Sequence, residues 1–161
     1  MLNKLHQLRE ERAEADKGFT LIELLVVVVI IGILIAIAIP LYLNYRKGAN
    51  DKSAQSDLRG AISALEQCNS DNSSYPTAAV TTTNPVTFTG CGQKVNLSSN
   101  SKFSYFPGTG NSDYVAISYN TSGNVDGTAT GGYYCYASAT GGSVKKETAL
   151  ASAETYATGC P

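Results

Sequence analysis

A single carboxylate, Glu23, lies at the start of a long apolar run, where a charged group is costly without a partner. The sixteen residues from Leu24 to Ile39 have no polar side chain, and flanking residues extend the apolar stretch over residues 19–43. A helix of that length can cross a bilayer. A charge at the centre of such a helix costs roughly 2.5–3.5 kcal/mol, and less near the interface. We therefore expect the Glu23 carboxylate to have a partner of opposite charge.

The four cysteines are the second group of reactive side chains, and all lie beyond the apolar run: Cys68, Cys91, Cys135 and Cys160. Because no two are spaced as CxxC, the pattern argues against a zinc site. An even number in a small exported domain favours two disulfides, each worth about 2–4 kcal/mol, over four free thiols. Three pairings are open. We favour Cys68–Cys91 and Cys135–Cys160, because each closes a loop of about two dozen residues.

The segment around Glu23 reads Lys17-Gly18-Phe19-Thr20-Leu21-Ile22-Glu23-Leu24 and resembles the N-terminus of a type IV prepilin. The resemblance covers residues 17–76. Pro40 falls where the family has its helix-kinking proline, and Tyr75-Pro76 follows the long helix as in many members. The resemblance implies that a membrane-embedded prepilin peptidase cuts after Gly18 on the cytoplasmic side and that Phe19 is then N-methylated. It also implies that Cys135–Cys160 bounds a C-terminal loop of the kind that many pilins carry.

Cleavage would give Phe19 an α-amine with an unperturbed pKa of about 8, which is largely cationic at neutral pH. Residues four apart share a face of a helix, so Phe19 and Glu23 belong together. The resemblance implies that Glu23 of one subunit neutralises the amine of its neighbour and so sets the axial register of a filament. The alternatives are an intrachain contact or a carboxylate at headgroup level.

Two other interpretations of the apolar segment are a secretion signal and a plain single-pass anchor. A cleavable signal has a shorter apolar core followed by a small-x-small site, and residues 40–47 offer none. Basic residues lie on both sides of the segment, so charge alone does not orient it. Only the resemblance places residues 1–18 in the cytoplasm and the rest of the polar chain outside.

The elements that position these residues follow from hydrophobic periodicity. Apolar residues at helical spacing predict that the helix continues as an amphipathic one packed on a sheet: Ala54, Leu58, Ala61, Ile62 and Leu65. Polar residues are expected on its other faces: Asp51, Lys52, Gln55, Asp57, Arg59 and Glu66. We expect one helix from Phe19 to about Cys68, kinked at Pro40 because proline lacks the amide hydrogen.

Short β-like runs follow Pro76 and predict four strands: Val86–Thr89, Phe103–Phe106, Tyr114–Tyr119 and Tyr133–Ala137. Residues 138–161 are expected to be loop, apart from a helical turn around Lys145–Ala153. The predicted fold class is α+β, the type IV pilin fold, with a long kinked N-terminal helix on a small antiparallel sheet. The predicted organisation is a leader (1–18), a membrane or filament-core helix (19–43), an amphipathic continuation (44–69) and a β-rich head (70–161).

Composition excludes several function classes. After Gly18 the chain has eight Lys/Arg and nine Asp/Glu without a basic stripe, so nucleic-acid binding is not evident. His6, the only histidine, lies in the predicted leader, which leaves no imidazole for catalysis or metal binding, and we expect neither an enzyme nor a cofactor. A calcium site at Asp113 and Asp126 is a minor alternative, since calcium needs six to eight oxygen ligands. Eight of ten tyrosines lie in the head; we expect strand filling rather than a stacking platform for bases or glycans.

The sequence therefore predicts a structural subunit of a type IV pilus, polymerised with copies of itself into a surface filament for motility, adhesion or DNA uptake. The partners implied by the resemblance are the prepilin peptidase and methyltransferase, an assembly platform with its ATPase, and the membrane before assembly. The alternatives are a type II secretion system pseudopilin and, in a different class, a single-pass membrane-anchored binding domain.

Overall fold

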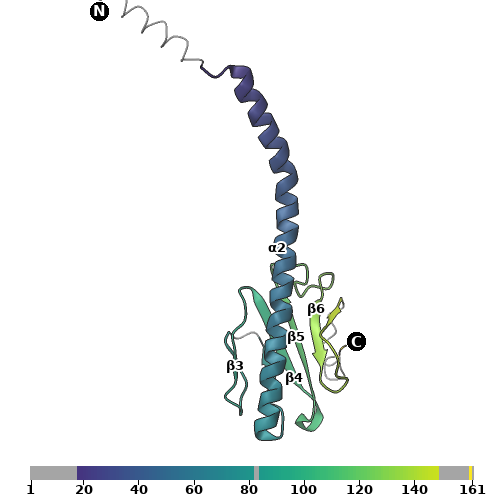
Figure 1. Cartoon of the computed structure of the whole chain (residues 1–161). Coiled ribbons are helices and arrows are strands. Elements are labelled where there is room, and N and C mark those ends of the chain that lie inside the picture. The colour runs from purple at the N-terminus through teal and green to yellow at the C-terminus, as the bar shows by residue number, and fades with distance from the viewer. Residues whose placement is uncertain (1–17, 82–83, 149–159, 161) are drawn as a thin grey trace, which may run out of the picture. The chain divides into compact units, whose positions relative to one another are not determined.

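The computed structural model describes residues 18–81, 84–148 and 160, so the predicted leader, apart from Gly18, lies outside the described residues. The chain divides into two compact units, Met1–Tyr42 and Leu43–Pro161, and each is described by itself. Helix α2, Leu21–Asn72, contributes residues to both units (Figure 1).

The first unit consists of the apolar part of α2. Its large side chains are exposed, from 48% for Ile31 to 85% for Leu21, and an 18-residue window of α2 has a mean hydropathy of 3.4. An α-helix satisfies its own backbone hydrogen bonds, so this segment is long and apolar enough to cross a bilayer. Pro40 lies inside the helix, whose hydrogen-bonded span continues beyond it. The kink expected at Pro40 stays a prediction.

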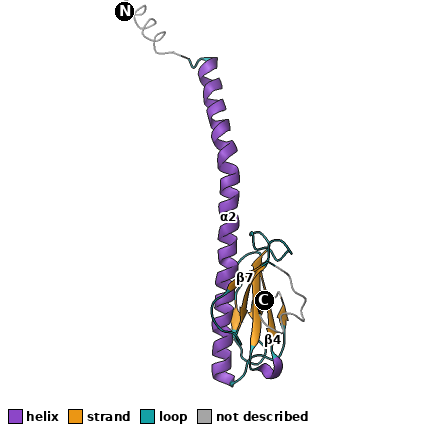
Figure 2. Ribbon diagram, turned by 90° about the vertical axis from the view of Figure 1, so that its right-hand side faces the viewer, coloured by secondary structure: helices purple, strands orange, loops and turns teal. Residues whose placement is uncertain are grey.

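The second unit packs the rest of α2 against a five-stranded antiparallel sheet (Figure 2). Its strand order is β1 (Val80–Thr81), β4 (Ser101–Pro107), β5 (Tyr114–Asn120), β6 (Tyr133–Ala137) and β7 (Lys145–Glu147). A separate two-stranded ribbon joins β2 (Val86–Thr87) to β3 (Lys94–Val95), and a short 3-10 helix, η1 (Thr109–Asn111), precedes β5. The α+β class predicted from the sequence is confirmed.

The apolar stripe of α2 faces the sheet as its periodicity predicts. Ala54, Leu58, Ala61 and Leu65 are all fully buried, whereas Ile62 is only partly buried at the edge of this core. Burying each leucine contributes about 1.5–3 kcal/mol. The helix ends at Asn72, a turn beyond the predicted end, because two further hydrogen bonds extend it. Asn72 Nδ2 donates to the Cys68 carbonyl, and the amide of Ser73 donates to the Asn69 carbonyl.

Strand β5 runs through the centre of the sheet and is buried on both faces. Tyr114 and Ala116 belong to the core on the α2 side, together with Phe103 and Tyr105 of β4. Val115 and Ile117 belong to a second cluster with Tyr133, Cys135 and Ala137 of β6. Val115 and Ile117 therefore share the face of the sheet opposite to the one that packs on α2.

Several predictions in the head are wrong in detail. Lys145–Glu147, expected within a helical turn, is strand β7, which pairs antiparallel with Tyr133–Cys135. Cross-strand hydrogen bonds to a ready-made sheet edge outweigh the weak local helix preference of three residues. The rest of that predicted turn, residues 149–153, lies outside the described residues. Strands β1 and β3 were not predicted, because two-residue strands leave no period-2 pattern to detect.

Two disulfides staple the second unit. Cys68 in the last turns of α2 bonds to Cys91, with 5.3 Å between their Cα atoms, and ties the helix to the loop between β2 and β3. Cys135 in β6 bonds to Cys160, with 5.9 Å between their Cα atoms. This is the pairing that the sequence analysis favoured.

Candidate assembly segment and its head

Glu23 takes part in a capping box at the N-terminus of α2. Its Oε2 accepts hydrogen bonds from the amide of Thr20 at 2.9 Å and from the Thr20 hydroxyl at 2.8 Å. The amide of Glu23 donates in turn to the Thr20 hydroxyl oxygen at 3.3 Å. Thr20 and Glu23 thus match the T-x-x-E signature, in which two otherwise unsatisfied amides at a helix start are paired. Thr20 was not predicted to cap the helix, although the signature is visible in the sequence.

The capping box holds the Glu23 carboxylate near the bond that the sequence predicts to be cut. Gly18 and Phe19 precede the helix, and the Phe19 side chain is 89% exposed. Both bonds from Thr20 end on Oε2, and within residues 18–81 and 84–148 no group donates to Oε1. In the uncut chain the carboxylate therefore makes an intrachain contact, one of the alternatives weighed above, and keeps one oxygen for a second donor.

Behind Glu23, the apolar part of α2 presents a continuous exposed surface of Leu, Ile and Val side chains. Exposed apolar patches larger than a few hundred Å² mark surfaces that bind a membrane or other chains. No residue of the most apolar 18-residue window of α2 is buried within the chain. This half of the helix therefore requires an external apolar environment, either lipid or neighbouring helices.

In the second unit, a buried carboxylate of α2 fixes the loop after β5. Asp51 is 8% exposed, and its Oδ1 accepts from the amides of Asn124 at 2.8 Å and Val125 at 2.9 Å. Its Oδ2 accepts from Asn124 Nδ2 at 3.0 Å, and a Cβ at Gly123 would collide with the carboxylate. Asp51 was expected among the polar residues on faces of the helix away from the apolar stripe, which is wrong. It lies three residues before Ala54, so the helical stripe continues back to it, and the amides of the loop replace its water.

Two further carboxylates of α2 hold other parts of the head. Asp57 accepts from the amide of Ser98 at 3.0 Å and from its hydroxyl at 2.9 Å. Glu66 accepts from the hydroxyls of Tyr75 and Tyr114, both at 3.0 Å. Polar residues of α2 that were expected on faces away from the apolar stripe therefore anchor the head to the helix.

Three tyrosines of the head pack as core residues. Tyr75, Tyr105 and Tyr114 are at most 8% exposed, and the Tyr75 and Tyr114 rings meet edge to face with centroids 4.7 Å apart. Burial, followed by the hydrogen bond to Glu66, raises the pKa of Tyr75 to about 12. Burial and Glu66 raise the pKa of Tyr114 as well. These positions favour strand filling over a stacking platform.

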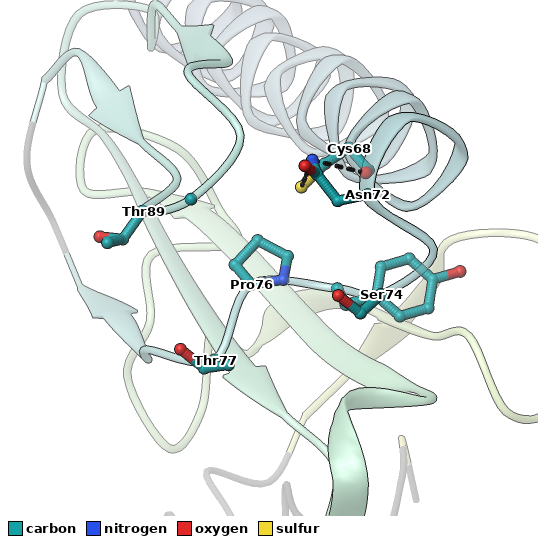
Figure 3. A pocket seen from close by; sticks show the side chains of 8 residues that line it. Cys68, Asn72, Ser74, Pro76, Thr77 and Thr89 are labelled. Carbon is teal, nitrogen blue, oxygen red and sulfur yellow. Dashed lines mark hydrogen bonds between the residues drawn. The ribbon is translucent and has the colours of Figure 1, made fainter.

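The described part of the head contains a cavity and two loop aspartates that bear on ligand or ion binding. A cavity of about 270 Å³ lies between the end of α2, residues 74–77 and the loop at Thr89 (Figure 3). Its lining carries hydroxyl and amide groups but no charged side chain. Asp113 and Asp126 precede and follow β5, so a seven-residue strand of about 20 Å separates them and they cannot share a calcium ion. Among the described residues, no group of three or more His, Cys, Asp or Glu could hold a metal.

Known proteins share the N-terminal motif and part of the sequence. Residues 15–39 match the family described as the prokaryotic N-terminal methylation motif. The chain is 51% identical over 59 residues to the type IV wide pilus major component PilA4 of Thermus thermophilus, a match over 37% of this chain and 45% of that protein. It is 39% identical over 66 residues to the type II secretion system core protein G of Klebsiella michiganensis, a match over 41% of this chain and 46% of that protein. The chain spans about half the length of the curated relatives that it matches.

Helix α2 begins at Leu21 with an exposed apolar part that is long enough to cross a membrane, and its remainder packs on a sheet in an α+β head. Through the methylation motif and these relatives, the N-terminal part of the chain is similar to the family of type IV pilins and pseudopilins. Members of this family are structural rather than enzymatic.

Proposed function

We propose that the chain is a prepilin whose mature form begins at Phe19 and polymerises into a type IV pilus on the cell surface. The observation that carries this proposal is the first unit, in which a capped helix exposes an apolar surface with one carboxylate at its start. Lipid can cover that surface before assembly, and the same surface of neighbouring copies can cover it in a filament.

Glu23 is expected to act both in the membrane and in the filament. Cutting the Gly18–Phe19 bond replaces an uncharged amide by an amine four residues before Glu23. The free Oε1 of Glu23 can accept from the amine of a neighbouring copy while Oε2 keeps its bonds to Thr20. An unpaired buried charge costs several kcal/mol, so the pairing favours the register in which both charges are neutralised.

The proposed sequence of events needs the partners that the family implies. A prepilin peptidase and methyltransferase matures the N-terminus while the chain waits in the membrane with its head outside. An assembly platform and its ATPase then transfer the subunit into the filament. In the filament the disulfide-stapled heads form the outer shell, which serves motility, adhesion or DNA uptake.

A type II secretion system pseudopilin is the second candidate. Three of the relatives are core protein G of that system, at 38–40% identity. Each of these matches covers 38–40% of this chain. The pilus is favoured by a head rich in Gly, Ser and Thr with two disulfides, since such a head suits a surface-exposed subunit.

The test is to shear cells that produce the chain and to identify its N-terminal peptide by mass spectrometry. We expect a peptide that begins with N-methylated Phe19 in the sheared filaments. The same peptide confined to membranes would favour the pseudopilin, and an N-terminus at Met1 would contradict both. A Gly18→Leu variant should accumulate as uncut precursor; mature protein at normal levels would show that the cleavage site is wrong.

A further inference from the structure

A cavity on the β7 side of α2 has the features of a contact site for another chain. It has a volume of about 290 Å³, and Ile62, Tyr136 and Val144 give it an apolar lining. All three are partly buried side chains at the edge of the core on the α2 side. Arg59 and Ser63 of α2 and Ser143 supply its polar groups.

Positive charge gathers on this side of the head. Arg59 is exposed, and its guanidinium has no hydrogen-bonding or ionic partner within the described part of the chain. Lys52 lies seven residues earlier, on the same side of α2. Lys146 is exposed and lies opposite Tyr134, a residue of the α2-side core, so it is on the same face of the sheet. Glu66, two turns further along α2, is a carboxylate that accepts from two tyrosine hydroxyls, and it does not line the cavity.

The complementary surface is the C-terminal end of the same helix. The last turn of α2 contains no basic residue to balance the negative end of the helix dipole. Asp71 is exposed there, and its one hydrogen bond comes from Gln67 Nε2 at 2.8 Å. This end of the helix therefore attracts a cation from outside the chain.

We propose that the cavity beside Arg59 receives the C-terminal end of α2 of a second copy, with Asp71 of that copy facing Arg59. Arg59 and Asp71 are twelve residues apart, or about 18 Å along the helix and a third of a turn around it. Because the two surfaces differ in position, the contact is heterologous, which is the kind of contact that can propagate as a helical polymer. The inference rests on the proposed function, since it names one contact between heads in the filament.

Cysteine cross-linking tests the contact, because every native cysteine is already in a disulfide. The variant carries Ser63→Cys in the cavity and Ser70→Cys beside Asp71. The two positions are seven residues apart on one helix, about 10.5 Å, which is too far for a disulfide within one copy. We expect mild oxidation of sheared filaments to give dimers and higher ladders on non-reducing gels, and neither single variant to do so. The matched control pairs Ser56→Cys with Ser70→Cys, which places the first thiol on the same side of α2 but two turns away.

Equal ladders from the control, or none from the Ser63 and Ser70 variant in filaments that form normally, would overturn the contact. Charge reversal gives a second readout that needs no thiol. Arg59→Glu and Asp71→Arg alone should each reduce the yield of sheared filaments several-fold, and the double variant should restore it. Unchanged yields in both single variants would also overturn the contact. If no sheared fraction contained a peptide starting at Phe19, the proposed function itself would fail.

Discussion

Replacing Asp51 by alanine is expected to loosen the loop after β5 and to destabilise the head. Asp51 accepts three hydrogen bonds, from the amides of Asn124 and Val125 and from Asn124 Nδ2. Alanine leaves both amides without an acceptor. Water can reach Asn124, which is exposed, but not Val125, which is 1% exposed.

The magnitude follows from these exposures. A buried donor left unsatisfied costs about 1–3 kcal/mol, and a hydrogen bond to a charged group contributes about 1.5–3 kcal/mol. Because the Asn124 groups regain water, we expect a loss of about 2–4 kcal/mol rather than the sum over three bonds. With about 4 °C per kcal/mol for a domain of this size, the midpoint of thermal unfolding should fall by roughly 8–16 °C.

The assay is thermal unfolding of the mature protein in detergent, followed by circular dichroism, with hydrogen exchange of the Val125 amide as a local readout. Asp71→Ala is the matched control, because Asp71 lies on the same helix, is exposed and accepts only from Gln67. Its effect should stay within about 0.5 kcal/mol. A midpoint for Asp51→Ala within about 2 °C of the unmodified protein, with Val125 still protected, would refute the reasoning, since a shift of that size corresponds to about 0.5 kcal/mol.

Three other outcomes are expected. Replacing Cys68 and Cys91 by serine should lower the unfolding free energy by about 3.5 kcal/mol, the loop-entropy value for 24 residues, and an unchanged guanidinium midpoint would contradict it. The raised pKa of Tyr75 means that the folded head favours the neutral phenol. The stability that this preference contributes is therefore complete below the unfolded pKa of about 10 and is lost as the pH rises through about 12. Replacing Tyr75 by phenylalanine should therefore remove a late phase from the titration of the tyrosine hydroxyls. Glu23→Ala should insert into membranes normally but give few filaments. A normal filament yield would contradict the proposal that Glu23 sets the axial register of the filament.

The long helix and its apolar stripe could be predicted because periodicity over many residues is a strong signal. The carboxylates of α2 could not be placed in the same way. Asp51 and Lys52 are neighbours in the sequence, yet only the position of the 120–125 loop makes one buried and the other exposed. That loop comes from residues about seventy positions away, and a local pattern carries no information about such a contact.

The strands also differ in how far their own residues predict them. Tyr133–Ala137 was predicted with the bounds that the structure has, because a run rich in aromatic residues directly after two glycines is a strong strand signal. Lys145–Glu147 was missed because its conformation is set by pairing with β6 and not by its own residues. The capping box at Thr20 was predictable in principle, because the T-x-x-E signature is a local pattern.

The most direct test of the account is a cryo-electron microscopy structure of the sheared filament at a resolution that shows side chains. The account predicts Glu23 Oε1 within about 4 Å of the Phe19 amine of a neighbouring copy, with Oε2 still bonded to Thr20 of its own copy. A filament in which the Phe19 amine lies far from every Glu23 would contradict the central claim that this carboxylate joins one copy to the next.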